Sequence, residues 1–120
     1  MKGLKVEGVT PDARVVTNAN GGQQSDTAYA FHLVDWDAFL AVAKRLKYGV
    51  ERGYERDNWK KIPAEEHFNH MLIHAIAAMA EDPTDDHLGA MMCRAMMFYS
   101  TLKQEQERRN YEKSLEKLGI

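Results

Sequence analysis

Residues 63–94 read PAEEHFNHMLIHAIAAMAEDPTDDHLGAMMCR, and this stretch predicts two consecutive helices. Pro63 followed by two glutamates is typical of a first helical turn, and we expect this helix to extend to about Glu81. Residues 82–84, Asp-Pro-Thr, then break the chain, because proline lacks the N–H that would continue the helix. The stretch therefore predicts two helices joined by a short connection.

The second of these helices is expected to begin at Thr84 or Asp85, because short polar side chains cap helix N-termini. It continues through Leu102 into a charged tail with a sparse apolar stripe. Apolar residues recur at three and four positions along both helices, which is typical of a face that packs against a core. The predicted core faces consist of Phe68, Met71, Leu72, Ala75 and Met79, and of Leu88, Met91, Met92, Ala95, Tyr99 and Leu102.

A polar stripe lies beside each predicted core face. His67, His70 and His74 share one stripe of the first helix, at about 100° per residue, and His87 and Arg94 share one stripe of the second. If the connection is short, the helices are antiparallel, Arg94 lies near the level of His74, and the two polar stripes can face each other. Histidine and arginine side chains are thus expected to meet at the level of His74.

Such a cluster suits a divalent metal ion or a phosphate group. Imidazole and carboxylate groups are good metal ligands, and a guanidinium group can hold two phosphate oxygens through parallel hydrogen bonds. A purely structural role is the alternative, because histidines at this spacing often pair with neighbouring carboxylates, as Glu66 and His70 can at positions i and i+4. Both interpretations stay open from the spacing alone.

The N-terminal part of the chain shows no helical periodicity. Lys5 to Thr10 and Arg14 to Thr17 are β-prone runs joined by Pro11-Asp12, which favours a short hairpin. Residues 18–26, NANGGQQSD, favour turns and positive φ angles. We expect this segment to be a loop with free backbone N–H groups, which can hold an anion.

The predicted fold class is mainly α, a helical bundle of three to four helices with a short N-terminal β-hairpin or extended segment. A first helix is expected from Asp35, its N-cap, through Lys47. The length of the chain suits one hydrophobic core, so we expect a single domain over residues 1–120. Within it, residues 1–34 form the extended segment with its Gly-rich loop, and residues 35–120 form the helical core and the C-terminal helix.

Composition limits the classes of partner. The formal net charge of −2 gives no long-range attraction to a polyanion, so a nucleic acid polymer is not expected as a partner. Cys93 is the only cysteine, and neither a signal peptide nor an apolar run of bilayer length is present, so we expect a cytoplasmic protein without membrane association. The long last helix, with Cys93 and Met97 opposite its core face, predicts a homo-oligomer.

A series of short motifs follows the chain in a fixed order. They are Gly21-Gly22-Gln23-Gln24-Ser25, Tyr48-Gly49, Asn58-Trp59, Ile62-Pro63, Glu66-His67, Asn69-His70, His74, Asp85-Asp86-His87-Leu88 and Cys93-Arg94. In the order and spacing of these motifs the chain resembles the dATP/dGTP diphosphohydrolase N-terminal family, which is found largely in phages. That family is similar in its helical character to MazG-type nucleotide pyrophosphohydrolases. The resemblance spans most of the sequence.

The resemblance implies a nucleotide ligand, an oligomer, a divalent metal (Mg²⁺ or Mn²⁺), and hydrolysis of a purine deoxynucleoside triphosphate between its α and β phosphates. The metal would neutralise the triphosphate and polarise a water molecule, whose proton a carboxylate or imidazole would accept. The expected metal ligands are Glu66, His70, His74 and Asp86, and the expected catalytic residues are Glu66, His70 and Asp86. The expected nucleotide-binding residues are Gly21, Gly22 and Arg94 at the phosphates, Asn58 and Trp59 at the base, and also Gln24, Ser25 and His87.

Two other functions stay open. One is a non-catalytic phage protein that binds and sequesters a nucleotide signal of host defence. Ala90 favours this alternative, because it stands where a further histidine is expected on the face of His87 and Arg94. The other is a helical interaction module whose charged tail binds a protein partner, which exposed methionines near Cys93 and Met97 would favour.

Overall fold

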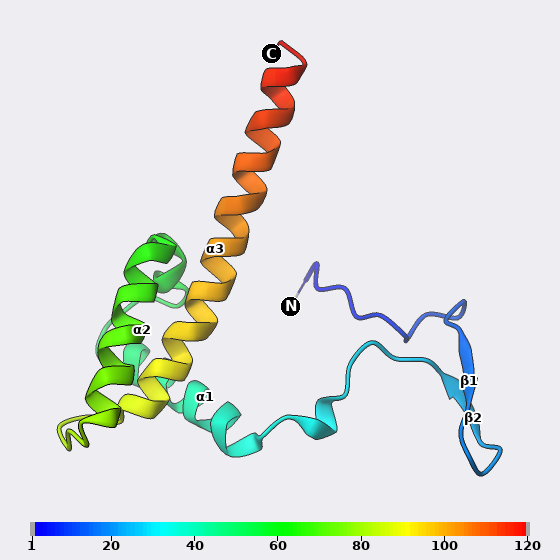
Figure 1. Ribbon diagram of the computed structural model, residues 1–120, viewed down its shortest axis with the longest axis horizontal. Coiled ribbons are helices and arrows are strands. Elements are labelled where there is room, and N and C mark those ends of the chain that lie inside the picture. Colours follow the sequence, from blue (N-terminus) through cyan, green and yellow to red (C-terminus); the bar gives the residue numbers. More distant parts are fainter. Residues whose placement is uncertain (1, 120) are drawn as a thin grey trace. The chain divides into compact units, whose positions relative to one another are not determined.

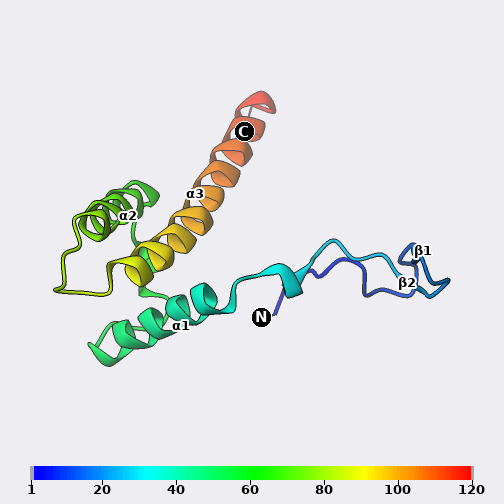
Figure 2. The ribbon, with the colours of Figure 1, turned by 60° about the horizontal axis from the view of Figure 1, so that its bottom comes forward.

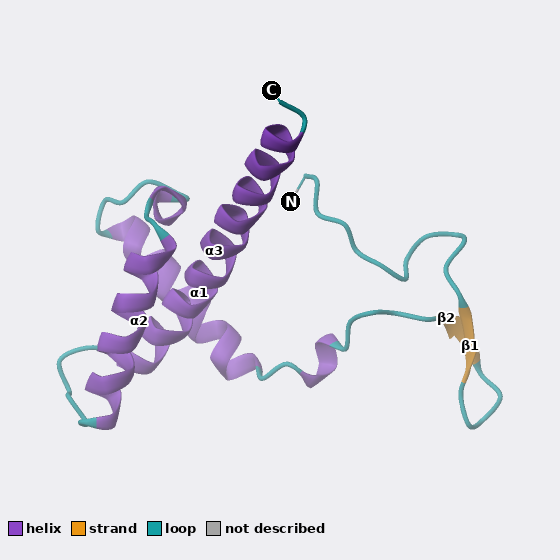
Figure 3. Ribbon diagram, turned by 45° about the horizontal axis from the view of Figure 1, so that its top comes forward, coloured by secondary structure: helices purple, strands orange, loops and turns teal. Residues whose placement is uncertain are grey.

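The computed structural model describes residues 2–119 and contains two compact units, which are divided between Asp35 and Trp36. Figure 1 colours the chain along its sequence, and Figure 3 separates helices from strands. The first unit contains two short strands, and the second contains the three α-helices. The fold is therefore mainly α with a short antiparallel sheet near the N-terminus, which confirms the predicted fold class.

The first unit is built around strands β1 (Val15–Thr17) and β2 (Gln23–Ser25), which pair antiparallel, and it ends with the 3-10 turn η1 (Phe31–Leu33). The predicted pairing of the run 5–10 with the run 14–17 is wrong, because β1 pairs instead with the segment expected to be a loop. Asn18 accounts for this choice, since it forms a tight turn directly after β1.

The turn between the two strands is held by one side chain. Asn18 Oδ1 accepts hydrogen bonds from the backbone N–H groups of Asn20 and Gly22, at 3.0 and 2.9 Å. The N–H of Gly21 donates to the Asn18 carbonyl at 3.1 Å, and Gly21 has a φ of 82°, which glycine adopts without strain. The N–H groups expected to be free for an anion are thus engaged within the turn.

The second unit contains α1 (Trp36–Glu51), η2 (Asn58–Lys61), α2 (Ala64–Met79) and α3 (His87–Lys117). Figures 1 and 2 show α2 and α3 running antiparallel, and α3 packs against both α1 and α2. The C-terminal part of α3 extends well beyond the first turn of α2. No helix in residues 2–119 combines the length and the apolar character that crossing a membrane requires.

The connection between α2 and α3 is longer than the sequence suggests. α2 ends at Met79, and α3 begins after residues 80–86. The predicted caps Thr84 and Asp85 are wrong, because Asp86 occupies the N-cap position and its Oδ1 accepts the backbone N–H three residues on, at 3.0 Å. Thr84, Asp85 and Asp86 are all suitable caps, and Asp86 is the one that caps the helix.

The faces that the helices bury differ from the predicted core faces. His67, from the predicted polar stripe, is 0% exposed, whereas Met79, from the predicted core face, is 87% exposed. His67 and His74 of the polar stripe thus lie in the contact between α2 and α3, together with half-buried apolar residues such as Met71 and Ala75, while Met79 stays uncovered in the described residues. The predicted core residues that are exposed are Phe68, Leu72, Met79, Leu88, Met92 and Tyr99.

Cys93 is buried, although the sequence pattern predicted that it faces away from the core. It is 3% exposed, together with the buried small residues Ala64 and Ala90, and does not face away from the core. The reason is that α3 has a neighbour on two sides, since α1 packs on it as well as α2. Burial raises the pKa of the Cys93 thiol, which disfavours the reactive thiolate form.

Candidate functional site

The two polar stripes face each other between α2 and α3. His67 on α2 contacts Arg94 on α3, and His74, two turns further along α2, contacts His87 at the start of α3. The prediction that Arg94 lies level with His74 is therefore wrong. α3 starts opposite His74 because residues 80–86 return along the last turn of α2 before the helix begins.

His67 uses both of its ring nitrogens. Its Nδ1 lies 3.0 Å from Arg94 Nη1, and its Nε2 lies 2.9 Å from the Trp59 carbonyl oxygen. A guanidinium group can only donate a hydrogen bond and a carbonyl can only accept one, so Nε2 carries the proton and Nδ1 accepts from Arg94. Burial lowers the pKa of His67, and the charge of Arg94 lowers it further, which agrees with a neutral ring.

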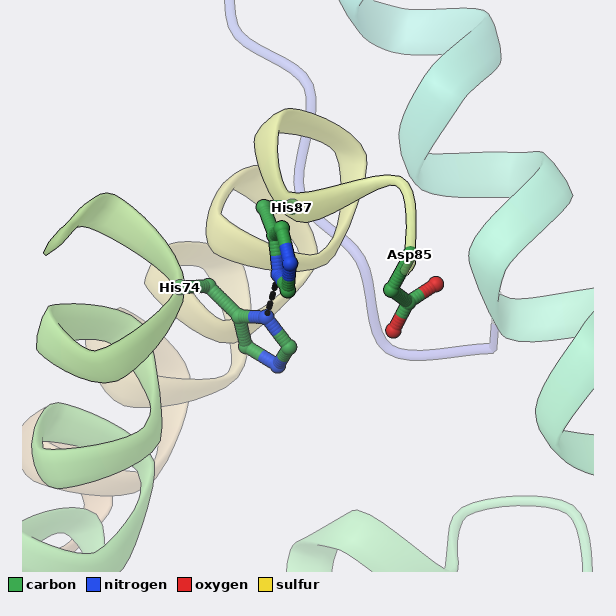
Figure 4. Close-up of side chains that lie close together, drawn as sticks. All are labelled: His74, Asp85 and His87. Atoms are coloured by element: carbon green, nitrogen blue, oxygen red, sulfur yellow. Dashed lines mark hydrogen bonds between the residues drawn. The ribbon is translucent and has the colours of Figure 1, made fainter. Parts of the chain in front are cut away.

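A second cluster joins α2, the connection and the start of α3. Figure 4 shows His74 and His87 with their Nδ1 atoms 3.0 Å apart, and Asp85 beside them. One ligand atom from each of the three residues lies within 4.8 Å of the others. Burial lowers the pKa of His74, and the charge of Arg45 adds to this effect, so the ring is neutral at pH 7. We call these three residues the His/Asp group.

His87 has an unused nitrogen. Its Nε2 is buried and has no hydrogen-bond partner among residues 2–119, and Asp82 Oδ1 lies 3.5 Å away, beyond ordinary hydrogen-bond length. Histidines that bind a metal through one nitrogen commonly direct the other N–H toward a carboxylate. Asp82 stands in that position if the Nδ1 of His87 holds a cation. An unsatisfied buried nitrogen thus points to chemistry that the chain alone does not complete.

Asp85 is held by Arg45 of α1. The two guanidinium nitrogens lie 2.7 and 2.8 Å from the two carboxylate oxygens, and this pairing lowers the pKa of Asp85 to about 2. Asp85 is therefore ionised at neutral pH, as a metal ligand must be. A cation that binds Asp85 also has to compete with Arg45 for the carboxylate.

A cavity of about 650 Å³ opens beside the His/Asp group, within the second unit. The end of α1, the segment that follows it, η2 and α3 form its walls, together with His74 from α2. Its volume is in the range of sites for small ligands of nucleotide size. The charged and aromatic residues that line it are Arg45, Arg52, Arg56, Arg94, Glu55, Asp57, Tyr48, Tyr54 and Trp59.

Arginine and tyrosine side chains are stacked along one wall of this cavity. The guanidinium carbon of Arg52 lies 5.5 Å from the centre of the Tyr48 ring and 5.8 Å from that of Tyr54. The guanidinium carbon of Arg45 lies 5.1 Å from the centre of the same Tyr48 ring. Flat aromatic surfaces can stack on a nucleobase, and guanidinium groups can bind phosphate oxygens. The wall therefore offers both kinds of contact that a nucleotide needs.

The structure brings several of the predicted site residues together. Asn58, Trp59, His74 and Arg94 line the cavity, and His87 joins His74 in the His/Asp group. These residues come from η2, α2 and α3, far apart in the sequence. Their proposed contacts with a nucleotide stay predictions, but their common position is the one that such contacts require.

Other predicted residues lie apart from this place. Glu66 is exposed, His70 is half-buried, and neither belongs to the His/Asp group that residues 2–119 form. Asp86 caps α3 with its carboxylate, while the neighbouring Asp85 faces the histidines. The catalytic roles predicted for these residues stay predictions, and the geometry favours Asp85 and His87 in their place as ligands. The remaining predicted residues, Gly21, Gly22, Gln24 and Ser25, lie in the first unit, the last two in β2.

Sequence reasoning missed the α1 wall of the cavity. Arg45, Tyr48 and Arg52 recur at i, i+3 and i+7, which places them on one helical stripe. This spacing was a usable signal, because two arginines beside a tyrosine on one face seldom serve a core. The pairing of Arg45 with Asp85 spans forty residues and left no local signal.

Comparison with known proteins adds a family. The family model described as dATP/dGTP diphosphohydrolase, N-terminal, matches residues 18–111. This range includes every residue that lines the cavity and all three residues of the His/Asp group. No curated protein and no solved structure matches the chain.

Proposed function

The chain belongs to the dATP/dGTP diphosphohydrolase N-terminal family, and we propose that it hydrolyses a purine deoxynucleoside triphosphate to the monophosphate and pyrophosphate. One observation carries this proposal: the nucleotide-sized cavity and the His/Asp group share a wall. His74 belongs to both, and Arg45 lines the cavity while it holds Asp85. A triphosphate in the cavity would lie beside the group that could bind a divalent cation.

The arginines of the cavity would bind the phosphates. Arg94 reaches the cavity from α3 and Arg45 from α1, so two cationic groups approach the same space from different helices. Charge-assisted contacts of this kind orient a phosphate chain and stabilise the charge that develops during hydrolysis. Trp59, Tyr48 and Tyr54, which also line the cavity, would contact the base by stacking.

His74, Asp85 and His87 would hold the cation. Two imidazoles and an ionised carboxylate form a donor set that suits Mn²⁺ better than Mg²⁺, which prefers oxygen ligands. When bound, the cation would neutralise phosphate charge and lower the pKa of a water molecule. The unsatisfied Nε2 of His87 supports this assignment, because the Asp82 carboxylate is near enough to accept a hydrogen bond from it after a small shift.

Incubation of the purified protein with each of the four deoxynucleoside triphosphates tests this function. We expect dATP or dGTP to give the monophosphate and pyrophosphate in the presence of Mn²⁺ and no product in EDTA. Separation of the products by ion-exchange chromatography identifies the bond that breaks. Release of inorganic phosphate and a diphosphate would contradict cleavage between the α and β phosphates.

Sequestration of a nucleotide without hydrolysis is the second candidate function. Two observations favour it: Asp85 is engaged by Arg45, and Ala90 lines the cavity, 2% exposed, where the family is expected to have a histidine. A sequestering protein would bind a nucleotide equally well in EDTA and would release it unchanged. Calorimetric titration in EDTA, followed by analysis of the recovered nucleotide, separates the two functions.

We also propose that the protein is a homo-oligomer. α2 leaves Ile76 and Met79 exposed at 69% and 87%, and Tyr111 in the C-terminal part of α3 and Leu118 directly after it are exposed as well. Apolar residues that form a continuous uncovered face commonly pack against another subunit. Light scattering at micromolar concentration should report a mass above that of one chain, and a monomer would contradict this proposal.

A further inference from the structure

His67 lies directly behind the wall of the cavity. Trp59 and Arg94 both line the cavity, whereas His67 does not reach it and is 0% exposed. Its ring bonds to both of these residues, to the Trp59 carbonyl through Nε2 and to the Arg94 guanidinium through Nδ1. One buried side chain therefore joins η2 to α3 at the place where both contribute to the wall.

We propose that His67 is a positioning residue of the nucleotide site, which holds the Arg94 guanidinium at the cavity before a phosphate arrives. This inference rests on the proposed function, because the phosphate is that of the nucleotide in the cavity. Arg94 would otherwise lose the freedom of a long, flexible side chain each time it bound a ligand. The hydrogen bond that Arg94 donates to the buried His67 ring orders the Arg94 side chain before a ligand binds.

The surroundings of Arg94 support this role. His67 is the only hydrogen-bond partner of its guanidinium among residues 2–119, and no carboxylate of that range pairs with it. A guanidinium has five N–H donors, so most of them stay available for phosphate oxygens. A neutral acceptor thus orients Arg94 without neutralising its charge. Arg45 differs, since a carboxylate occupies two of its donors.

The tautomer of His67 makes the arrangement specific. Because the Trp59 carbonyl fixes the proton on Nε2, the Nδ1 lone pair is directed at Arg94. The Trp59 and His67 rings also meet edge to face, with centroids 6.3 Å apart. The ring therefore cannot turn to exchange its two partners without breaking both contacts.

A double-mutant cycle tests whether His67 acts through Arg94. His67→Phe keeps an aromatic ring and removes both nitrogens, and His32→Phe is the matched control at an exposed histidine of η1. The probe is the α,β-methylene analogue of dATP or dGTP, titrated by NMR up to millimolar concentration. We expect His67→Phe to weaken binding about tenfold in the parent chain and less than twofold in Arg94→Ala. Equal losses in both backgrounds would overturn the inference.

Two conservative variants separate positioning from packing. The side-chain amide of His67→Asn places an oxygen near the former Nδ1, and that of His67→Gln places a nitrogen near the former Nε2. Circular dichroism confirms that each variant is folded. If His67 positions Arg94, the Asn variant should bind the analogue more tightly than the Gln variant. Equal affinities, or the reverse order, would show that Arg94 does not depend on this acceptor.

NMR of the ligand-free chain keeps this inference distinct from the proposed function. Nitrogen shifts of the His67 ring should show the Nε2–H tautomer, and a scalar coupling should connect Nδ1 to an Arg94 N–H. A protonated ring, or the other tautomer, would overturn the positioning role even in a chain that binds nucleotide. If the coupling is present but no nucleotide binds, the proposed function fails, and with it the role of this pair in binding.

Discussion

Two histidine clusters lie between α2 and α3, two helical turns apart, and they differ in how far their hydrogen bonds are completed. At His67 both ring nitrogens have partners, which come from η2 and α3. At His87 one nitrogen is bonded to His74 and the other is buried without a partner in residues 2–119. The first cluster is complete within the described residues, whereas the second keeps a buried nitrogen whose hydrogen bond to Asp82 is not formed, and we assign a cation to it for that reason.

The arginines beside the clusters differ in the same direction. Arg94 has no carboxylate partner in the described residues, so its charge is available to an anionic ligand. Arg45 is bound through two donors to Asp85, and a cation at Asp85 would compete with Arg45 for the carboxylate. Cation binding would thus release a second arginine into the cavity. We therefore propose that the two clusters bind ligands of opposite charge, because their arginines are bound so differently.

The largest effect is expected for His74→Ala, which removes one ligand of the incomplete cluster. Hydrolysis of dATP or dGTP in Mn²⁺ should fall by at least about a hundredfold, since loss of a ligand removes more than the outer-shell changes that cost ten- to a hundredfold. Affinity for the nucleotide in EDTA should change by less than about threefold. Product analysis and calorimetry measure the two quantities, and His32→Ala is the matched control. Full hydrolysis in His74→Ala would contradict our assignment of the cation.

Arg94→Ala should have the opposite signature, because it belongs to the completed cluster. A charge-assisted contact contributes about 1.5–3 kcal/mol, so nucleotide affinity should fall by about ten- to a hundredfold, in EDTA as well as in Mn²⁺. Calorimetric titration gives the dissociation constant. Arg109→Ala, on the exposed part of α3, is the control and should bind as the parent does. Unchanged binding in a folded Arg94→Ala chain would place the site elsewhere.

The sequence predicted the helices and their polar stripes, and it was less successful with the faces that they bury. The spacing of His67, His74, His87 and Arg94 is a local property of a helix, so it could be read directly. Which stripe packs inward depends on the neighbours of each helix, and apolar residues were expected there. Met79 is instead exposed. A histidine stripe can occupy the interface because its nitrogens find partners across it.

The connection and the long-range contacts could not be predicted from local patterns. Thr84, Asp85 and Asp86 are all good helix caps, and the choice among them sets which residues of α3 face His74. The bond between Arg45 and Asp85 depends on how α1 packs on the start of α3. Hydrophobic periodicity carries no information about that packing. The carboxylate that lies beside the two histidines is therefore that of Asp85, one residue before the predicted ligand Asp86.

Acidification should act on both clusters and lower the stability of the fold moderately. Burial lowers the pKa of His67 and of His74, so below about pH 6.5 the unfolded chain binds protons that the folded chain resists. The stability that these residues contribute is therefore present at pH 7.5 and is lost as the pH falls from about 6.5 toward the lowered values. The melting temperature should fall by a few degrees between pH 7.5 and 5.5.

Variants assign this pH dependence to the buried histidines. His67→Gln and His74→Gln should each flatten the curve of melting temperature against pH, and His32→Gln, at an exposed position, should leave it unchanged. A second decrease is expected as the pH falls from about 4 to about 2, because Asp85 takes up a proton near pH 4 in the unfolded chain, whereas Arg45 lowers its pKa to about 2 in the folded chain. A melting temperature that is constant from pH 7.5 to 5.5 would show that these rings are not held neutral in the folded chain.

The smallest effect is expected for Asn18→Ala, which extends the comparison of the two clusters to the first unit. Asn18 holds the turn between β1 and β2 by accepting two backbone N–H groups, so its loss should alter the NMR shifts of residues 15–25 and cost about 1 kcal/mol or less. Nucleotide affinity should stay within about twofold of the parent value, because the N–H groups of this turn bond to Asn18 and the proposed contacts all come from the second unit.

The same variant decides between two sources of phosphate contacts. If Gly21 and Gly22 hold a phosphate, as their position in a glycine-rich turn first suggested, distortion of the turn should weaken binding about as strongly as Arg94→Ala does. A loss of that size in calorimetric titration, with the helices intact by circular dichroism, would show that the N–H groups leave Asn18 when the ligand binds. An unchanged affinity would leave the arginines of the cavity as the groups that bind the phosphates, since backbone donors that are already bonded have little to gain from a new partner.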